Sequence, residues 1–279
     1  MPGVRVVTDS TADVPRDFVE KLEISVVPLS VHFGADTYQD GIDLTPGQFF
    51  HRLESTSVLP TTSQPSVGAF QEAYGRLGEA GHDIISIHLS STLSGTYNSA
   101  LLATQSLPHL TIEVVDSRYV SMAVGWLVIA AAQAALEGNS LPQIVLLVRN
   151  MIPRVRLFAL LDTLEFVRRG GRIGKASALL GSLLNIKPII LVRDGEVWPS
   201  EKVRTRPKAL RRLVEMTQEA GTVERLAVVH SNCPDEANEL AEILGRGMPR
   251  ERKIVTEIGP VLGTHVGPGA IGTCFVLAD

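Results

Sequence analysis

The sequence predicts an α/β protein of two domains, and two patterns along the chain carry that prediction. In the first half, short apolar runs alternate with helix-like segments, as in a mainly parallel, Rossmann-like sheet with helices on both faces. After Pro153 the alternation gives way to a hairpin with further strands and helices. This second pattern is typical of an α+β domain with a mixed or antiparallel sheet. We therefore expect one domain at residues 1–155 and another at residues 156–279.

The first half predicts a regular series of elements. Val4 to Thr8 has the composition of a strand buried on both faces, and a short helix follows Pro15. Thr45-Pro46-Gly47-Gln48 is a capping box with proline at the first helical position, which predicts a helix over 46–53. The other expected elements are a β-rich run at 24–33, helix 67–77, strand 84–89, helix 97–105, strand 111–115 and a buried helix near 120–136.

The second half contains two strong turn signals. Asp194-Gly195 stands between two β-rich runs and predicts a two-residue hairpin. The glycine-rich segment from Gly259 to Gly269 predicts a shaped loop around its single histidine, His265. The remaining expected elements are strand 157–161, helices 163–168 and 176–184, strands 186–193 and 197 onward, helix 207–219, strand 225–230, helix 234–244, and strands near 253–257 and 273–277.

Composition argues against several classes of function. The chain is 44% hydrophobic and 20% charged, as in a globular protein with a sizeable core, and its net charge of −4 argues against broad nucleic-acid binding. Two cysteines, Cys233 and Cys274, are expected as buried thiols. No Cys/His cluster has zinc-like spacing, and no signal-peptide pattern opens the chain. We expect a cytoplasmic protein with no metal, no cofactor and no stable membrane insertion.

Two hydroxyl-rich runs stand directly before predicted helices. Ser90 to Thr96 follows a strand, where ligands of parallel sheets bind, and Ser91 and Ser94 offer neutral donors beside the free N–H groups of a helix start. Thr61 to Ser66 precedes the helix at 67–77. Neither run contains Lys or Arg, so a head group with one charge, such as a carboxylate, suits them better than a polyphosphate. Simple helix capping is the alternative for both runs.

Two further motifs have competing interpretations. Asp9 ends the first strand and is expected on the pocket side, although a turn or a capping role explains it equally well. The run from Arg168 to Lys175 is basic and glycine-rich, but its glycine spacing is one residue short of a Walker motif. Ala176 also stands where Ser or Thr would bind magnesium. We therefore exclude a phosphate loop and keep a solvated charged turn as one alternative.

Taken in order, these motifs resemble the DegV family, bacterial fatty-acid-binding proteins that serve as the lipid-carrying subunit of fatty acid kinases. The resemblance covers nearly the whole chain. It is carried by Thr8 to Asp13, Thr62 to Ser66, Ser90 to Thr96, Asp116-Ser117, Thr163 to Phe166, Arg169 to Gly174 and Gly263 to Gly269.

The resemblance implies a long-chain fatty acid, such as palmitate, in an apolar tunnel between the two domains. It assigns the carboxylate to the hydroxyls of Thr62 and Ser94, the N–H of Gly95, and His265 as a nearby partner. Burying a C16 tail at ~0.8 kcal/mol per methylene gives on the order of 10 kcal/mol. Each hydroxyl bond to the charged head adds roughly 1.5–3 kcal/mol. The tail should therefore set affinity, and the head should set orientation.

The resemblance also implies presentation to a separate ATP-dependent kinase, with at most transient membrane contact and without catalysis by this chain. Arg172 near the pocket mouth, with Lys202, Arg204 and Arg206, would help to dock an acidic partner. One alternative is a phosphoryl- or acyl-transfer enzyme with Ser94 as nucleophile and His265 as base, although Ser94 lacks a Gly-x-Ser-x-Gly elbow. The other alternative is a small-molecule sensor.

Overall fold

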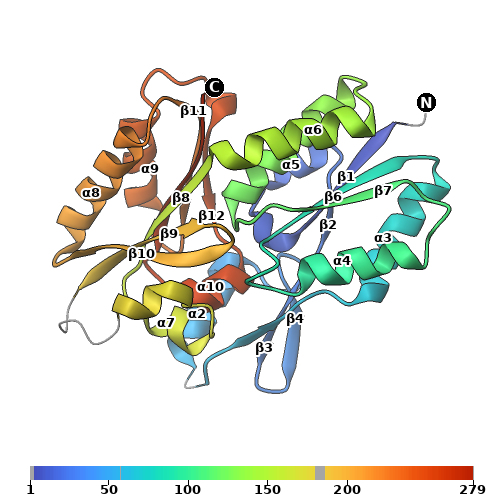
Figure 1. Ribbon diagram of the computed structural model, residues 1–279. Coiled ribbons are helices and arrows are strands. Elements are labelled where there is room, and N and C mark those ends of the chain that lie inside the picture. The colour runs from blue at the N-terminus through green and yellow to red at the C-terminus, as the bar shows by residue number, and fades with distance from the viewer. Residues whose placement is uncertain (1–2, 57, 180–185, 279) are drawn as a thin grey trace.

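Two sheets, each carrying its own helices, make up most of the molecule (Figure 1). The computed structural model describes residues 3–56, 58–179 and 186–278. The first sheet has the order β2-β1-β6-β7, and all of its neighbouring strands are parallel. This confirms the parallel sheet expected from the alternating pattern. Its strands are β1 (Val4–Asp9), β2 (Ser25–Val27), β6 (Asp83–His88) and β7 (Ile112–Asp116).

Helices cover both faces of this first sheet, as a parallel sheet requires. One face carries α3 (Val67–Glu79) and α4 (Thr96–Gln105), and the other carries α5 (Met122–Leu136) and α6 (Leu141–Met151) (Figure 1). Helix α6 was not expected from the sequence, although Ser140 and Gln143 form a capping box at its start. A short η1 (Ser10–Ala12) and α1 (Arg16–Lys21) connect β1 to β2.

The second sheet is mixed, with the order β10-β9-β8-β13-β11-β12. Only β11 and β12 pair in parallel within it. Asp194 and Gly195 both have positive φ, 53° and 82°, so the expected hairpin turn is confirmed. The outer face is covered by α8 (Arg206–Glu219) and α9 (Pro234–Leu244). The strands are β8 (Val155–Leu160), β9 (Lys187–Arg193), β10 (Glu196–Val203), β11 (Val223–His230), β12 (Lys253–Glu257) and β13 (Ile271–Leu277).

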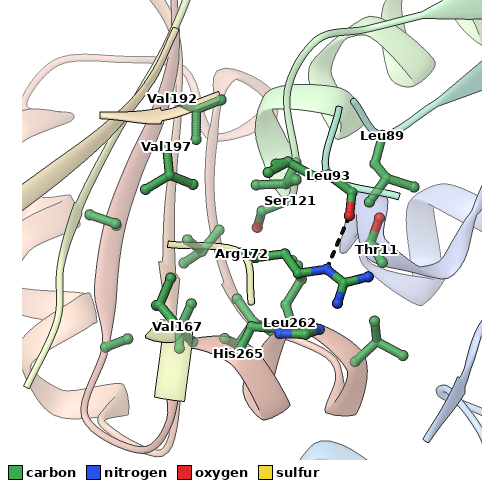
Figure 2. A pocket seen from close by; sticks show the side chains of 18 of the residues that line it. Thr11, Leu89, Leu93, Ser121, Val167, Arg172, Val192, Val197, Leu262 and His265 are labelled. Atoms are coloured by element: carbon green, nitrogen blue, oxygen red, sulfur yellow. Dashed lines mark hydrogen bonds between the residues drawn. The ribbon is translucent and has the colours of Figure 1, made fainter. Parts of the chain in front are cut away.

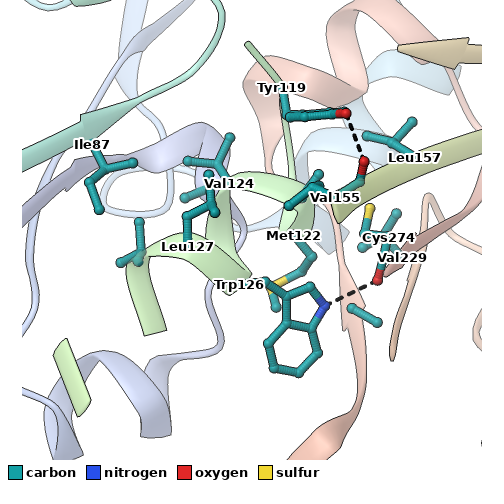
Figure 3. Packing of buried hydrophobic residues seen from close by; sticks show 14 of the residues in the cluster. Ile87, Tyr119, Met122, Val124, Trp126, Leu127, Val155, Leu157, Val229 and Cys274 are labelled. Carbon is teal, nitrogen blue, oxygen red and sulfur yellow. Dashed lines mark hydrogen bonds between the residues drawn. The ribbon is translucent and has the colours of Figure 1, made fainter. Parts of the chain in front are cut away.

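Helix α5 lies between the two sheets and is buried along most of its length. Its sequence is almost entirely apolar because it has no solvated face, which confirms the expected buried helix. Two hydrogen bonds tie this region to the second sheet: the Tyr119 hydroxyl donates to the Val155 carbonyl at 2.7 Å, and Trp126 Nε1 donates to the Cys274 carbonyl at 3.1 Å (Figure 3). Among the described residues, no helix is both long and apolar enough to cross a bilayer.

A third, three-stranded sheet was not expected. It consists of β3 (Ser30–Phe33) between β4 (Asp36–Gln39) and β5 (Thr61–Ser63), and it lies beside α2 (Pro46–Ser55) (Figure 1). The capping box at Thr45 starts α2 as predicted. Strand β5 places the Thr61 to Ser63 hydroxyls on a defined edge of this sheet, and the sequence did not predict a strand there.

Two predictions in the second half need correction. The Gly259 to Gly269 segment is not a loop, because Pro260–Val266 forms helix α10. Its glycines serve close packing: a Cβ at Gly263 would lie 2.7 Å from Phe49. The helix expected at 176–184 is a 3-10 helix, η3 (Gly174–Leu179), over its described part, and the rest lies outside the described residues. Helix α7 (Glu165–Arg169) and the short η2 (Ile152–Arg154) and η4 (Arg250–Arg252) complete the chain.

Candidate functional site

A cavity of about 370 Å³ lies between the first and second sheets. Residues from both expected domains line it, which agrees with a site at their junction, while the boundary at residue 155 stays a prediction. In Figure 2, Val192 and Val197 of the second sheet face Leu89 and Leu93, which follow β6 of the first sheet. Arg172 extends across the space between them.

The floor of the cavity is a row of cross-strand neighbours in the second sheet. Val229, Gly272, Ala159 and Ile190 lie side by side on β11, β13, β8 and β9, and all four line the cavity. Neighbours on one face of a sheet share a surface, so the two small residues in the middle leave a hollow between larger ones. A Cβ at Gly272 would lie 3.1 Å from the Val229 side chain. The hollow is therefore produced by residue size at two strand positions.

The opposite wall is formed by segments beyond the carboxyl ends of β1, β6 and β7. Thr11, Leu89, Leu93 and Ser121 come from these segments, as the rule for parallel sheets predicts. The Thr11 and Ser121 hydroxyls are already hydrogen-bonded, to the buried carboxyl groups of Asp9 and Asp13, respectively. Helix α10 closes one side with Val261, Leu262, His265 and Val266.

The polar end of the cavity centres on Thr62 and His265. The Thr62 hydroxyl lies 2.9 Å from Nε2 of His265. Strand pairing with Val31 fixes Thr62, and α10 packs on β3, β5 and α2, which brings His265 to the same place. Burial, together with the positive charge of Arg172, lowers the pKa of His265 to about 4. The imidazole is therefore neutral near neutral pH and offers one donor and one acceptor.

Ser94 also lines the cavity, but Gly95 does not. The Ser94 hydroxyl lies 2.9 Å from that of Thr96 and accepts from the Thr96 N–H, which is the first N–H of α4. Gly95 is packed against Gln64, because a Cβ there would lie 2.1 Å from Gln64 Oε1. Gln64 itself lines the cavity and donates to Ser99. Gln64 was not expected at the cavity, because it carries an amide although it stands in the hydroxyl-rich run from Thr61 to Ser66.

Asp9 is enclosed in the protein and does not reach the cavity. Its carboxylate accepts from the Leu89 N–H and pairs with His88, whose other ring nitrogen contacts Ser86 at 2.7 Å. This is a serine, histidine and carboxylate arrangement, but all three side chains have no exposed surface, and Tyr74 donates to Ser86. Asp9 therefore holds the strand ends in place.

Ser91 and Arg204 also lie away from the cavity lining. The Ser91 hydroxyl donates to Asp116 at 2.5 Å, which stabilises the corner that carries Ser94. Arg204 is exposed just before α8. Arg206, expected beside it in a docking patch, is instead held by Glu236.

Arg172 lines the cavity and is also exposed to solvent, so it lies at the cavity mouth. Its Nε donates to the Leu93 carbonyl at 3.2 Å (Figure 2). Its terminal nitrogen Nη1 donates to the Gly170 carbonyl at 2.8 Å. The first bond joins the segment after α7 to the Ser90 to Thr96 corner, and the second holds Arg172 within its own segment. The guanidinium therefore places a fixed positive charge next to the neutral hydroxyls.

Two buried acids hold the start of α10, and the sequence did not assign them this role. Asp13 accepts from the Gly259 N–H at 2.9 Å, and Asp40 accepts from the Val261 N–H at 3.4 Å. Burial raises the pKa of Asp13 to about 8 and that of Asp40 to about 6. Because α10 carries His265, these carboxyl groups position the polar end of the cavity indirectly.

The enzyme alternative requires a hydrogen bond between Ser94 and His265. Among the described residues these two side chains share none, since Ser94 pairs with Thr96 and His265 with Thr62. Within the same part of the chain, no group of three or more His, Cys, Asp or Glu side chains is arranged to hold a metal ion. The arrangement supplies hydrogen-bond donors and one cation beside an apolar space, without an assembled nucleophile and base.

The fold and the site together define a class: two-domain α/β proteins with a largely apolar cavity between their sheets, polar at one end. The chain belongs to the DegV family, whose model, described as "Uncharacterised protein, DegV family", matches residues 3–278. Protein DegV of Bacillus subtilis is 37% identical over 277 residues, which cover 98% of this chain and 99% of that protein.

Solved structures of similar proteins carry ligand descriptions. A DegV family protein of Thermus thermophilus, described by its fatty acid binding, has a TM-score of 0.92 at 34% identity and covers 99% of this chain and 100% of its own. DegV of Bacillus subtilis, described as a fatty acid binding protein, has a TM-score of 0.91 at 36% identity, with full coverage of both chains. A stearic acid-binding protein of Eubacterium ventriosum has a TM-score of 0.89 at 25% identity and covers 98% of each chain.

Proposed function

We propose that this protein binds a long-chain fatty acid such as palmitate in the cavity between its sheets and presents the carboxylate to a separate ATP-dependent kinase. The observation that supports this best is the asymmetry of the cavity. Its lining is mainly Leu, Val and Ile, whereas Thr62, Ser94, His265 and Arg172 lie in one region. Thr62 contacts His265, Arg172 acts electrostatically on His265, and Arg172 bonds to Leu93, the neighbour of Ser94. An apolar chain gains free energy in the first region, and a singly charged head finds donors in the second.

Thr62 and Ser94 bind the carboxylate through their hydroxyls, and Arg172 adds a charge-assisted contact. Gly95 N–H, the other donor considered, stands next to Ser94 at the first turn of α4 and is a weaker candidate because Gly95 does not line the cavity. The hydrocarbon lies along the hollow at Ala159 and Gly272. The descriptions of the Thermus and Bacillus relatives as fatty acid binding support the same ligand class.

Two features of the described residues support a separate kinase over catalysis by this chain. Ser94 and His265 are not paired, and the basic segment 168–175 lacks the spacing of a nucleotide loop. The head group lies near the exposed Arg172, where a partner can reach it. The kinase would therefore act in the cytoplasm on a carboxylate held at the protein surface, and its docking would involve Arg172 and Arg204.

Lipid extraction tests whether the bound ligand is a fatty acid. Mass spectrometry of organic extracts from the native purified protein should recover one fatty acid per chain, and delipidated protein should rebind palmitate. Absence of any bound or rebound fatty acid would contradict the proposal. Incubation of the protein alone with ATP and palmitate, or with acyl esters, should give no turnover, and turnover would favour the transferase alternative.

A further inference from the structure

The imidazole of His265 has two ring nitrogens in very different surroundings. Nε2 faces the Thr62 hydroxyl at 2.9 Å, at the edge of the cavity. Nδ1 is buried, and no hydrogen-bond partner reaches it among the described residues. It lies against the backbone of Gly170, where a Cβ would approach to 2.2 Å. A neutral imidazole carries its proton on one of these two atoms, and the partners of each atom decide which.

We propose that Gly170 fixes the tautomer of His265 with the proton on Nε2, so that His265 donates to Thr62 and the Thr62 proton is directed to the ligand. This inference rests on the proposed function for the identity of the ligand. Gly170 is a positioning residue here, because it acts on the head group only through His265.

The alternative tautomer would leave a buried hydrogen-bond donor without an acceptor. With the proton on Nδ1, a buried N–H would face the Cα of Gly170 without an acceptor. Buried donors without partners are rarer in proteins than acceptors without partners. With the proton on Nε2, only a lone pair faces Gly170, and the N–H is satisfied by Thr62 Oγ1.

The need for a close approach explains why residue 170 is a glycine. Its φ is −70°, a conformation that any residue adopts, so backbone strain does not require glycine here. The constraint is space, since any side chain at this position would displace the imidazole. Displacement of the ring would break the contact between Nε2 and Thr62 on the other side.

As a result, each hydrogen bond from His265 to Thr62 and from Thr62 to the ligand has a defined donor. His265 Nε2–H donates to Thr62 Oγ1, and Thr62 Oγ1–H then has no acceptor in this pair and is free to donate to a carboxylate oxygen. In the opposite tautomer the Thr62 hydroxyl would donate its proton to Nε2, and it would offer the ligand only a lone pair. An ionised carboxylate has no proton to give to that lone pair.

Imidazole carbon and nitrogen chemical shifts near neutral pH distinguish the two tautomers directly. The protein has seven histidines, so the His265 signals are assigned by their loss in His265→Gln. We expect the Nε2–H form in delipidated wild-type protein, and the Nδ1–H form would overturn the proposal. This readout does not require bound lipid, so it stays decisive even if the wild type binds no fatty acid and the proposed function fails.

Two matched substitutions test the consequence for binding. The amide nitrogen of Gln stands near the place of Nε2, whereas that of Asn stands near the place of Nδ1. His265→Gln should keep palmitate affinity within a fewfold change, while His265→Asn should lose roughly tenfold to hundredfold, the value of one hydrogen bond to a charged group. Equal affinities for the two variants would contradict the proposal.

A glycine pair tests the positioning role. Gly170→Ala should alter the His265 shifts and weaken palmitate binding by a similar factor. Gly75→Ala, on α3 where a Cβ meets no atom within 4 Å, should change neither. Unchanged His265 shifts in folded Gly170→Ala protein would remove Gly170 from the mechanism.

Discussion

The Thr62 hydroxyl and Nε2 of His265 lie 2.9 Å apart, although 203 positions separate the two residues in the chain. The contact joins β5, in the small third sheet, to α10, near the end of the chain. The polar end of the cavity therefore exists only when the first and last parts of the protein are folded against each other.

Removal of the Thr62 and Ser94 hydroxyls should weaken binding of the fatty acid carboxylate and leave the contacts with the acyl tail intact. We expect Thr62→Ala combined with Ser94→Ala to lower palmitate affinity by at least about a hundredfold, since each hydroxyl bond to a charged group contributes roughly 1.5–3 kcal/mol. Rebinding of palmitate to delipidated protein, followed by calorimetry, measures the change. Thr104→Ala on α4, whose hydroxyl donates only to the Leu101 carbonyl, is the control. Equal affinity in the double variant would show that these hydroxyls do not hold the carboxylate.

A larger residue on the cavity floor should shorten the acceptable acyl chain. Ala159→Leu fills the hollow beside Gly272 and should displace terminal methylenes, each of which contributes ~0.8 kcal/mol when buried. Affinities for saturated acids of increasing length should stop rising at a shorter chain than in the wild type. Ala159→Ser, which is nearly the same size, should keep the wild-type profile. An unchanged profile in Ala159→Leu would mean that the tail lies elsewhere.

The buried carboxyl group of Asp13 should make stability depend on pH. Burial raises its pKa from 3.8 to about 8, so between these values the folded protein keeps a proton that the unfolded chain has released. The free energy of unfolding should therefore fall as pH rises through this window, by up to about 1.4 kcal/mol per pH unit, and level off above it.

Asp13→Asn removes this titration and keeps an acceptor for Gly259. Denaturant unfolding at a series of pH values should give a shallower slope for this variant, with a remainder from Asp40, whose pKa burial raises to about 6. Asp17→Asn, in the first turn of the exposed helix α1, is a matched control. Identical slopes for wild type and Asp13→Asn would show that Asp13 titrates normally.

Charge reversal near α8 should weaken docking of the proposed kinase without changing palmitate affinity. Lys202→Glu with Arg204→Glu replaces two exposed cations, one on β10 and one just after it, with negative charges. We expect the affinity for the kinase to fall severalfold, and more at low salt, because exposed charges act through screened electrostatics. Arg76→Glu on α3 is the control. Surface plasmon resonance with the purified kinase makes the comparison, and unchanged binding would exclude this face as the docking site.

Most of the first sheet could be predicted from the sequence, because local signals and tertiary structure agree there. Buried strands are continuous apolar runs, and the hydroxyl-rich run from Ser90 to Thr96 closely follows the end of β6. The capping box at Thr45 and the Asp194-Gly195 turn are equally local. Helix α5 was predictable as a buried helix because it has no polar face.

The parts that could not be predicted depend on contacts between distant segments. The glycines around α10 suggested a loop, but they admit Phe49 and Phe166 close to the helix backbone. A three-residue polar strand such as β5 carries too little periodicity to be recognised. The role of Gly170 likewise depends on His265 lying against it, and no pattern near residue 170 contains that information.

The position of α5 bears on how the proposed fatty acid would enter. Helix α5 packs on the first sheet and α6 on one side and on β8, β11 and β13 on the other. Moving the two sheets apart would expose the apolar face that meets the second sheet and break the hydrogen bonds of Tyr119 and Trp126. We therefore expect the ligand to enter where α7 and α10 pack together and Arg172 bonds to Leu93. Fatty acid exchange rates should respond to substitutions at that edge and be insensitive to substitutions in α5.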